Sequence, residues 1–206
     1  MIDDPSRSTV VAWYDGVPDG LALLVERVQA TAGRLLGDAF AARDAAQVHA
    51  TVIGLERAPV PFDPAPLTAH LRAALSPPWT IRFGGFPPGE RRLLSRGLPL
   101  HDRTFGVYGD KVVLVGWPVV GGAPLRTLAD VRLGCGAFGV THRYGDDPDV
   151  HLVIGEVTDA AEHVAAAVRR ELALRAVHVP LTFDDLSLVT YVDTALPRAS
   201  TTWRSL

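Results

Sequence analysis

Two stretches decide the fold: V-H-A-T-V-I-G-L at residues 48–55 and V-H-L-V-I-G-E-V at residues 150–157. Each is a short run of apolar, mostly β-branched residues, which predicts a buried strand, and each has a histidine at its second position. Because successive side chains of a strand point to opposite faces, His49 shares a face with Thr51. An imidazole among aliphatic side chains is costly to bury unless it is hydrogen bonded or used.

The segments around these strands repeat in the same order. The first half is expected to run helix, histidine strand, capped helix, strand, and the second half repeats this order from residue 124 to residue 192. The two histidines are 151 − 49 = 102 residues apart, which is too far for a solenoid repeat and fits a duplicated lobe. We therefore predict an α+β fold that is bilobal and pseudo-twofold. Two antiparallel sheets flanked by helices would enclose a central groove.

A length of 206 residues favours a single domain made of two related lobes. We expect the first lobe to comprise about residues 9–83 together with residues 186–193. The second lobe is expected at about residues 104–175. Residues 1–8 and 195–206 are expected to be loose tails.

Composition and charge exclude several classes of protein. Hydrophobic residues make up 48% and charged residues 21%, as in an ordinary globular domain. The formal charge of 20 − 23 = −3 lacks the basic surplus of a nucleic-acid coat or a polybasic membrane binder. A single cysteine, Cys135, permits no intrachain disulfide. With no secretory signal pattern or membrane-length apolar run, we expect a cytoplasmic monomer that binds neither membranes nor duplex DNA.

The paired histidine strands indicate acid–base chemistry. If the lobes are related by a pseudo-twofold axis, His49 and His151 face one another across the groove. One imidazole could then remove a proton from the attacking oxygen while the other protonates the leaving oxygen of a phosphodiester, without a metal ion. Taken singly, each histidine is more simply explained as a hydrogen-bonded structural residue. Two histidines in matched contexts favour catalysis.

The string His49-Ala50-Thr51 resembles the H-x-T signature of the two-histidine (2H) phosphoesterase superfamily. This group includes the LigT-like proteins, also called 2′-5′ RNA ligases, and the RNA 2′,3′-cyclic phosphodiesterases. The resemblance covers about residues 9–193 and depends mainly on the order of elements. It implies that both motifs line one groove, that His49 and His151 catalyse without metal or other cofactor, and that Thr51 contacts the phosphate.

The second motif departs from that signature, because Val153 stands where the family usually has threonine or serine. Loss of one donor to a developing oxyanion costs about 10²–10³ in rate. One hypothesis is a phosphodiesterase that acts on a 2′,3′-cyclic phosphate or a 2′-5′-linked nucleotide or RNA end. In this hypothesis, Val153 could lower the rate of hydrolysis. The alternative is a non-catalytic or weakly active module that binds a nucleotide or RNA end in the same groove. Retention of both histidines favours the enzyme.

Three further residues are candidate substrate contacts. Arg143 and Tyr144 directly precede the second histidine strand, so we expect them at the mouth of the groove, although a solvated loop would explain them as well. Trp13, on the first expected strand, could stack on a base or could belong to the core. The remaining histidines form no H-E-x-x-H or H-x-x-x-H pair, so we expect no catalytic zinc site.

Overall fold

The computed structural model describes residues 7–55, 63–158, 162–192 and 196–206. Its strands are β1 (Arg7–Ala12), β2 (Phe40–Ala42), β3 (Ala50–Gly54), β4 (Trp79–Gly84), β5 (Leu94–Ser95), β6 (Leu98–Pro99), β7 (Phe105–Tyr108), β8 (Lys111–Val120), β9 (Ala123–Pro124), β10 (Val150–Val157), β11 (Ala176–Leu181), β12 (Leu186–Tyr191) and β13 (Thr202–Ser205). Its α-helices are α1 (Asp19–Leu36), α2 (Ala65–Ala74), α3 (Leu100–Arg103), α4 (Thr127–Gly134) and α5 (Glu162–Ala173).

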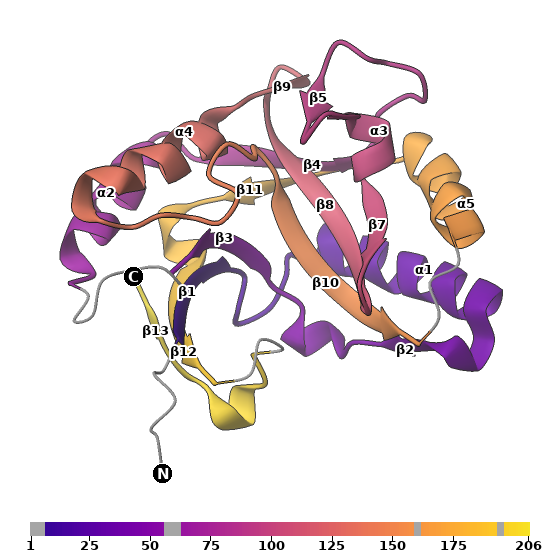
Figure 1. The fold of residues 1–206 in the computed structure, drawn as a ribbon, viewed down its shortest axis with the longest axis horizontal. Helices are drawn as coiled ribbons and strands as arrows, with labels where there is room; N and C mark the ends of the chain where they lie inside the picture. Colours follow the sequence, from indigo (N-terminus) through magenta and orange to yellow (C-terminus); the bar gives the residue numbers. More distant parts are fainter. Residues whose placement is uncertain (1–6, 56–62, 159–161, 193–195) are drawn as a thin grey trace.

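The strands form one large antiparallel sheet with the order β11-β4-β8-β10-β3-β1-β12-β13. Strand β2 is added beside β10, and β7 and β9 are added beside β8. Helices flank this sheet, so the predicted α+β class is confirmed (Figure 1). The two sheets expected from the sequence are joined through β10 and β3, and the only separate sheet among the described residues is the β5–β6 pair.

The two histidine strands meet at the middle of this sheet. Strands β3 and β10 are antiparallel neighbours, with Thr51 opposite His151 and Ala50 opposite Leu152. Along the sheet order, three further strands follow on either side of this pair. Helices α1 and α5 pack together on the β10 side, and α2 and α4 pack together at the other end of the molecule (Figure 1). The junction of the two halves is therefore built from the two motifs.

Local signals in the sequence predict several of these elements correctly. The sequence D-G-L-A-L-L from residue 19 predicts a helix capped by Asp19 and ended at Gly37; the helix is α1, but Asp19 is its first residue, Pro18 precedes it, and no side chain caps it. Its end is as predicted, next to Gly37, whose φ of +55° lies in the left-handed region where glycine is favoured. The turn residues Gly109 and Asp110, between apolar runs at 104–108 and 111–117, predict a hairpin, and β7 and β8 form it. The cap expected at Asp63 is present, because its Oδ1 accepts a hydrogen bond of 3.0 Å from the Ala65 N–H. Among the described helices, none has the length and apolar character needed to span a membrane.

The distribution of elements between the halves differs from the expected lobes. Strand β4 and helix α1 both lie within residues 9–83, yet β4 pairs with β8 and β11, and α1 packs on β11, β2 and α5. Gly116 of β8 explains where β4 docks, since a Cβ there would lie 2.5 Å from the Phe83 ring of β4. The missing side chain admits Phe83. Such long-range complementarity leaves no periodic signal in a sequence.

The predicted loose tails are also corrected. Strand β1 begins at Arg7, and residues 1–6 lie outside the described part of the chain. Within residues 195–206, strand β13 pairs with β12. The hydroxyl groups of Tyr14 and Thr201 are hydrogen bonded at 2.6 Å. The C-terminal segment is thus part of the fold, although its exposed strand lacks the apolar pattern that marks a buried one.

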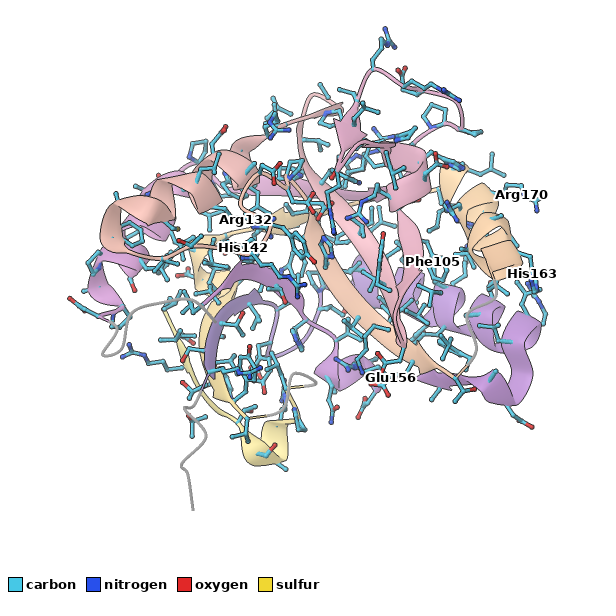
Figure 2. The ribbon with its side chains drawn as sticks, in the orientation of Figure 1. Phe105, Arg132, His142, Glu156, His163 and Arg170 are labelled. Atoms are coloured by element: carbon cyan, nitrogen blue, oxygen red, sulfur yellow. The ribbon has the colours of Figure 1, made fainter. Side chains whose placement is uncertain are left out.

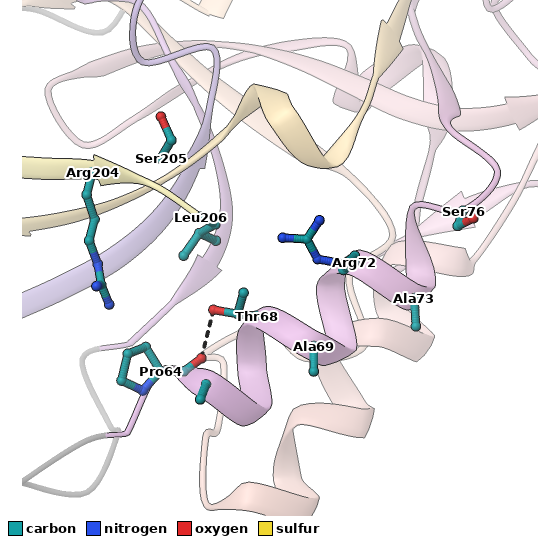
Figure 3. A pocket seen from close by; sticks show the side chains of 10 residues that line it. Pro64, Thr68, Ala69, Arg72, Ala73, Ser76, Arg204, Ser205 and Leu206 are labelled. Atoms are coloured by element: carbon teal, nitrogen blue, oxygen red, sulfur yellow. Dashed lines mark hydrogen bonds between the residues drawn. The ribbon is translucent and has the colours of Figure 1, made fainter.

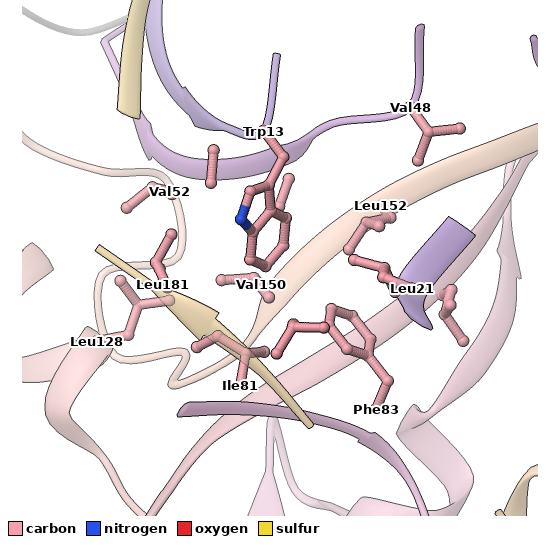
Figure 4. Close-up of a cluster of buried hydrophobic side chains, with 14 of the residues drawn as sticks. Trp13, Leu21, Val48, Val52, Ile81, Phe83, Leu128, Val150, Leu152 and Leu181 are labelled. Carbon is pink, nitrogen blue, oxygen red and sulfur yellow. The ribbon is translucent and has the colours of Figure 1, made fainter. Parts of the chain in front are cut away.

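The large sheet has two differently covered faces. One face packs against the helices in the main core, which includes Val48, Ala50, Val150 and Leu152 (Figure 4). The opposite face carries two smaller clusters. The Tyr14 cluster consists of Val11, Tyr14, Val189, Tyr191 and Leu196. The Trp117 cluster consists of Phe86, Leu100, Val113, Val115 and Trp117.

Candidate functional site

The histidine motifs lie on the sheet face opposite the main core, between the two smaller clusters. His49 directly precedes β3, and its neighbours Val48 and Ala50 both belong to the main core, whereas its own ring lies on the side of the Tyr14 cluster. There its ring contacts the Tyr14 ring edge-on, with centroids 5.6 Å apart. Alternation between faces along β10 directs His151 away from the core.

The pairing of β3 with β10 brings the two motifs together in the sheet. Thr51 is directly opposite His151, and His49 precedes Thr51 by two residues, just before β3 begins at Ala50.

His49 is buried and held in one orientation. Its Nδ1 lies 2.8 Å from the carbonyl oxygen of Gln47, to which it donates in the neutral ring, so Nε2 is left as the unprotonated acceptor. Burial lowers the pKa of His49 to about 4, against the opposing effect of that hydrogen bond, and the charge of Arg43 lowers it further. At neutral pH this histidine is an uncharged base.

His151 has the opposite electrostatic environment. Its Nε2 is hydrogen bonded to Asp149 and lies 3.8 Å from a carboxylate oxygen of Asp147. Burial alone would lower the pKa of His151, but these two carboxylates outweigh it and hold the pKa above its usual value. The side chain is 26% exposed, whereas both carboxylates are almost completely buried. This histidine therefore favours the charged, proton-donating form.

A cavity of about 230 Å³ opens beside His151. It is lined by Thr51, Arg132, His142, Arg143, Tyr144, Asp147 and His151. Four residues expected at the site are thus brought together, namely Thr51, Arg143, Tyr144 and His151. His49, which precedes β3, is not among the residues that line this cavity. The volume is below the roughly 300–1,000 Å³ of drug-sized pockets and suits a small polar group.

The aromatic ring at the mouth of the cavity is covered by two arginines. The guanidinium group of Arg96 lies 4.1 Å from the centroid of the Tyr144 ring, and that of Arg143 lies 5.3 Å from it. Tyr144 is 36% exposed. Positive charge is therefore concentrated at the entrance, as an anionic ligand requires.

Arg132 of α4 is the main site residue that the sequence analysis missed (Figure 2). Its side chain is buried and donates to three backbone carbonyl oxygens, those of Val52 at 2.9 Å, Asp147 at 2.6 Å and Thr51 at 3.4 Å. Burial lowers the pKa of Arg132 to about 10, which leaves it charged at neutral pH. It ties α4 to β3 and to the loop that precedes β10.

Replacing Arg132 with methionine is expected to lower the free energy of unfolding by about 3–5 kcal/mol, the usual loss when a buried charged partner is removed. Three buried carbonyl groups would lose their donor, and the charge that faces Asp147 and Asp149 would be gone. Urea unfolding measures this change. Arg170→Met, at an exposed position of α5, is the matched control and should change stability little (Figure 2). Equal stability of both variants would contradict a structural role for Arg132.

Asp147 and Asp149, the two carboxylates beside His151, are themselves bound by Ser95 and Arg103 in a buried network. Ser95 donates to Asp147 at 2.5 Å and to Asp149 at 3.2 Å, and Arg103 lies 3.3 Å from Asp149 and 3.7 Å from Asp147. The carboxylates and His151 could offer three metal-ligand atoms within 4.8 Å of one another. However, the Arg103 guanidinium group already lies against both carboxylates. Their negative charge is therefore balanced by a side chain of the protein itself. We assign the network the role of orienting and charging His151.

Two residues proposed from the sequence have different environments from those expected. Trp13 is only 4% exposed and packs in the main core, 6.4 Å from the Phe83 ring, so its ring cannot stack on a base (Figure 4). Val153 is half-buried and packs against the Trp117 cluster. It contributes an apolar surface beside the motif and no hydrogen-bond donor.

A larger cavity, about 810 Å³, lies elsewhere, between α2 and the end of β13 (Figure 3). Most of its lining residues are small, and Arg72 and Arg204 supply its charge. Within it, the Thr68 hydroxyl donates to the Pro64 carbonyl of its own helix. Its described lining residues include no histidine, aspartate or glutamate side chain, so acid–base chemistry points to the smaller cavity.

The fold is similar to that of a solved protein, TT0787 of Thermus thermophilus. The match covers 97% of this chain and 94% of that one, with a TM-score of 0.53 and 16% sequence identity. A conserved protein of unknown function, ATU0111 from Agrobacterium tumefaciens, matches over 86% of this chain and 81% of its own, with a TM-score of 0.45 and 12% identity. No protein-family profile and no curated protein sequence matches. The similarity to TT0787 concerns the fold alone.

Proposed function

We propose that this chain is a metal-independent phosphodiesterase of the two-histidine type. Its substrate would be a 2′,3′-cyclic phosphate or a 2′-5′-linked phosphodiester of a nucleotide or RNA end. One observation carries the proposal: the motifs of His49 and His151 meet where β3 pairs with β10, and the environments of the two histidines move their pKa values apart. Pairs of titratable groups tuned in opposite directions are typical of acid–base catalysts.

The opposite pKa shifts assign a role to each histidine. For a cyclic substrate, Nε2 of His49 takes a proton from water while the water oxygen bonds to phosphorus. The bond from phosphorus to one ribose oxygen breaks, and His151 protonates that oxygen through Nδ1, since its Nε2 is held by Asp149. The products are a phosphomonoester and a free hydroxyl, and solvent restores both histidines. His49 begins neutral and His151 begins charged, as these roles require.

Other residues would hold the phosphate. Thr51 lines the cavity and would donate its hydroxyl hydrogen to a phosphate oxygen, and Arg143 would supply positive charge in the same cavity. The buried Arg132 side chain would add a second positive charge in the wall of the cavity. The small volume and the mildly acidic whole chain favour a nucleotide or a strand end over a long duplex.

The proposal is tested by incubating the protein with 2′,3′-cyclic nucleotides and 2′-5′-linked dinucleotides in excess EDTA. We expect hydrolysis to one phosphomonoester isomer at the same rate with and without the chelator. Activity that disappears with EDTA and returns with a divalent metal would favour a metal hydrolase instead. Substrates that remain intact under both conditions would contradict a phosphodiesterase.

A binding module is the second candidate function, and one observation favours it. The described cavity lining includes His151 and Thr51 but not His49, and Val153 offers no donor. Such a protein would hold the terminal phosphate of a nucleotide or RNA end without hydrolysing it. Tight binding of a nucleoside 2′- or 3′-monophosphate, combined with no turnover of any phosphodiester, would identify this alternative.

Asp149→Asn is expected to shift the alkaline limb of kcat/KM to lower pH by about one to three units. The substitution keeps the shape of Asp149 but removes a negative charge that stabilises the His151 imidazolium, so the pKa of His151 falls and the acid is lost sooner. Activity at pH 7 should drop while activity near pH 5 is retained. Asp130→Asn, on the exposed side of α4, is the control. An unmoved alkaline limb would show that Asp149 does not set it.

A further inference from the structure

His142 is the histidine of the cavity that the proposed mechanism leaves without a role. It lies in the loop between α4 and β10, next to Arg143, and it lines the cavity with Thr51 and His151. Figure 2 shows it close to Arg132, whose charge acts on its ring. Nothing in the H-x-T pattern marks this position.

The tautomer of His142 is fixed by the backbone. The N–H of Gly54, at the end of β3, donates a hydrogen bond of 2.8 Å to Nδ1 of His142. A nitrogen that accepts a hydrogen bond carries no proton, so the proton of the neutral ring is on Nε2. Among the described residues, Nε2 has no hydrogen-bond partner, and it is not sealed from solvent. It is a donor that opens to the cavity.

The surroundings also keep this ring neutral. Burial lowers the pKa of His142 to about 3, and the positive charges of Arg132 and His151 lower it further, against the weaker opposing effect of Asp147. At neutral pH, His142 therefore presents a single N–H and does not compete with His151 as an acid. A neutral donor of this kind resembles the hydroxyl of threonine or serine in what it offers a phosphate oxygen.

A neutral N–H donor is relevant here because the second histidine motif has Val153 where a hydroxyl residue is expected. Thr51 provides a donor from β3, whereas the corresponding position of β10, Val153, packs against apolar side chains. A phosphate at this site would receive a hydroxyl donor from one motif only. The structure places His142, rather than a motif residue, where a replacement donor can reach the same cavity.

We propose that the Nε2–H of His142 donates a hydrogen bond to a phosphate oxygen bound in the cavity and supplies the donor that Val153 cannot. The class of ligand, a phosphomonoester or phosphodiester anion, rests on the proposed function. The donor role itself rests on the tautomer fixed by Gly54 and on the open face of the ring. His142 is therefore a phosphate-binding residue of this chain.

Two substitutions separate the donor from the acceptor of His142. In His142→Asn, the amide oxygen can take the place of Nδ1 and keep the bond from Gly54, but the donor at Nε2 is lost. In His142→Gln, the longer side chain can place its amide nitrogen near Nε2 and keep the donor, but the acceptor for Gly54 is lost. Binding of inorganic phosphate and of a nucleoside 2′-monophosphate is measured by calorimetry, and folding is checked by urea unfolding.

We expect His142→Asn to bind both probes about tenfold to a hundredfold more weakly than the parent, as for the loss of one hydrogen bond to a charged group. His142→Gln should bind them nearly as well as the parent. The reverse order would show that His142 only supports Gly54, and it would overturn the proposal. Unchanged binding in both variants, or equal losses in both, would overturn it as well.

The same measurements keep this inference apart from the proposed function. Weaker phosphate binding by His142→Asn in a protein that hydrolyses no phosphodiester would support the donor and reject the enzyme. Hydrolysis by the parent with undiminished phosphate binding by His142→Asn would support the enzyme and reject the donor. A parent protein that binds neither probe and turns over no substrate would reject both.

Discussion

Replacing His151 with alanine is expected to reduce hydrolysis of a 2′,3′-cyclic nucleotide by about 10²–10⁴-fold, the usual contribution of a general acid or base. The ribose oxygen is a poor leaving group and needs a proton as its bond to phosphorus breaks. His151 favours its protonated form because Asp147 and Asp149 raise its pKa. Steady-state kinetics should place the loss in kcat more than in KM.

A substrate with a better leaving group tests the role assigned to His151. A nitrophenyl phosphodiester releases a stable anion that needs no proton, so the deficit of His151→Ala should shrink markedly on this substrate. His163→Ala, on the exposed surface of α5, is the matched control and should behave as the parent does (Figure 2). A deficit of the same size on both substrates would remove the acid role from His151.

Replacing His49 with alanine should cost about as much, roughly 10²–10⁴-fold, for a different reason. His49 is the base, and its deprotonated form is the active one. In the parent, kcat/KM should therefore fall only as the pH approaches about 4, the value to which burial lowers the pKa of His49. Above this value the base is free, and activity should be flat until His151 loses its proton.

The pH profile and the choice of substrate distinguish His49 from His151. In His49→Ala, the limb near pH 4 should disappear while the alkaline limb remains, and a nitrophenyl leaving group should not rescue the variant. Because the two histidines would act together, each apparent pKa in the pH profile describes the pair of groups. The single variants show which histidine causes each apparent pKa. A parent profile that falls near pH 6.5 on its acid side would contradict the burial-lowered pKa of His49 and its role as base.

The sequence predicted the centre of the fold because the signal there is local. The apolar runs around His49 and His151 specify strands, and the matched order of elements placed them side by side. The hairpin at Gly109 and the end of α1 at Gly37 are likewise set by short-range turn chemistry. The same reasoning placed Arg143 at the cavity, since it directly precedes a motif strand.

The residues that the sequence analysis missed depend on partners far along the chain. An arginine in an amphipathic helix is normally solvated, and nothing near Arg132 shows that carbonyl groups of β3 and of the loop before β10 will surround it. The role of Asp149 depends on Arg103 and Ser95, which are 46 and 54 residues away from it along the chain. Such tertiary pairing has no periodicity that a single sequence can reveal.

The error at Trp13 has a different physical cause. Alternation between faces holds only within a strand, and β1 ends at Ala12. Trp13 itself has a φ of +58°, a left-handed conformation that is uncommon for a bulky residue. The ring consequently enters the main core, and Tyr14 contacts His49 instead.

The seam between the two half-sheets is short where the motifs meet. The β3–β10 ladder has two paired positions, whereas the neighbouring β8–β10 ladder has six. An anion bound by Thr51 of β3 and His151 of β10 would link the two half-sheets across this seam. The ligand would thus stabilise the contact between the two half-sheets as well as fill the cavity. Saturating the protein with ligand would raise its free energy of unfolding by mass action.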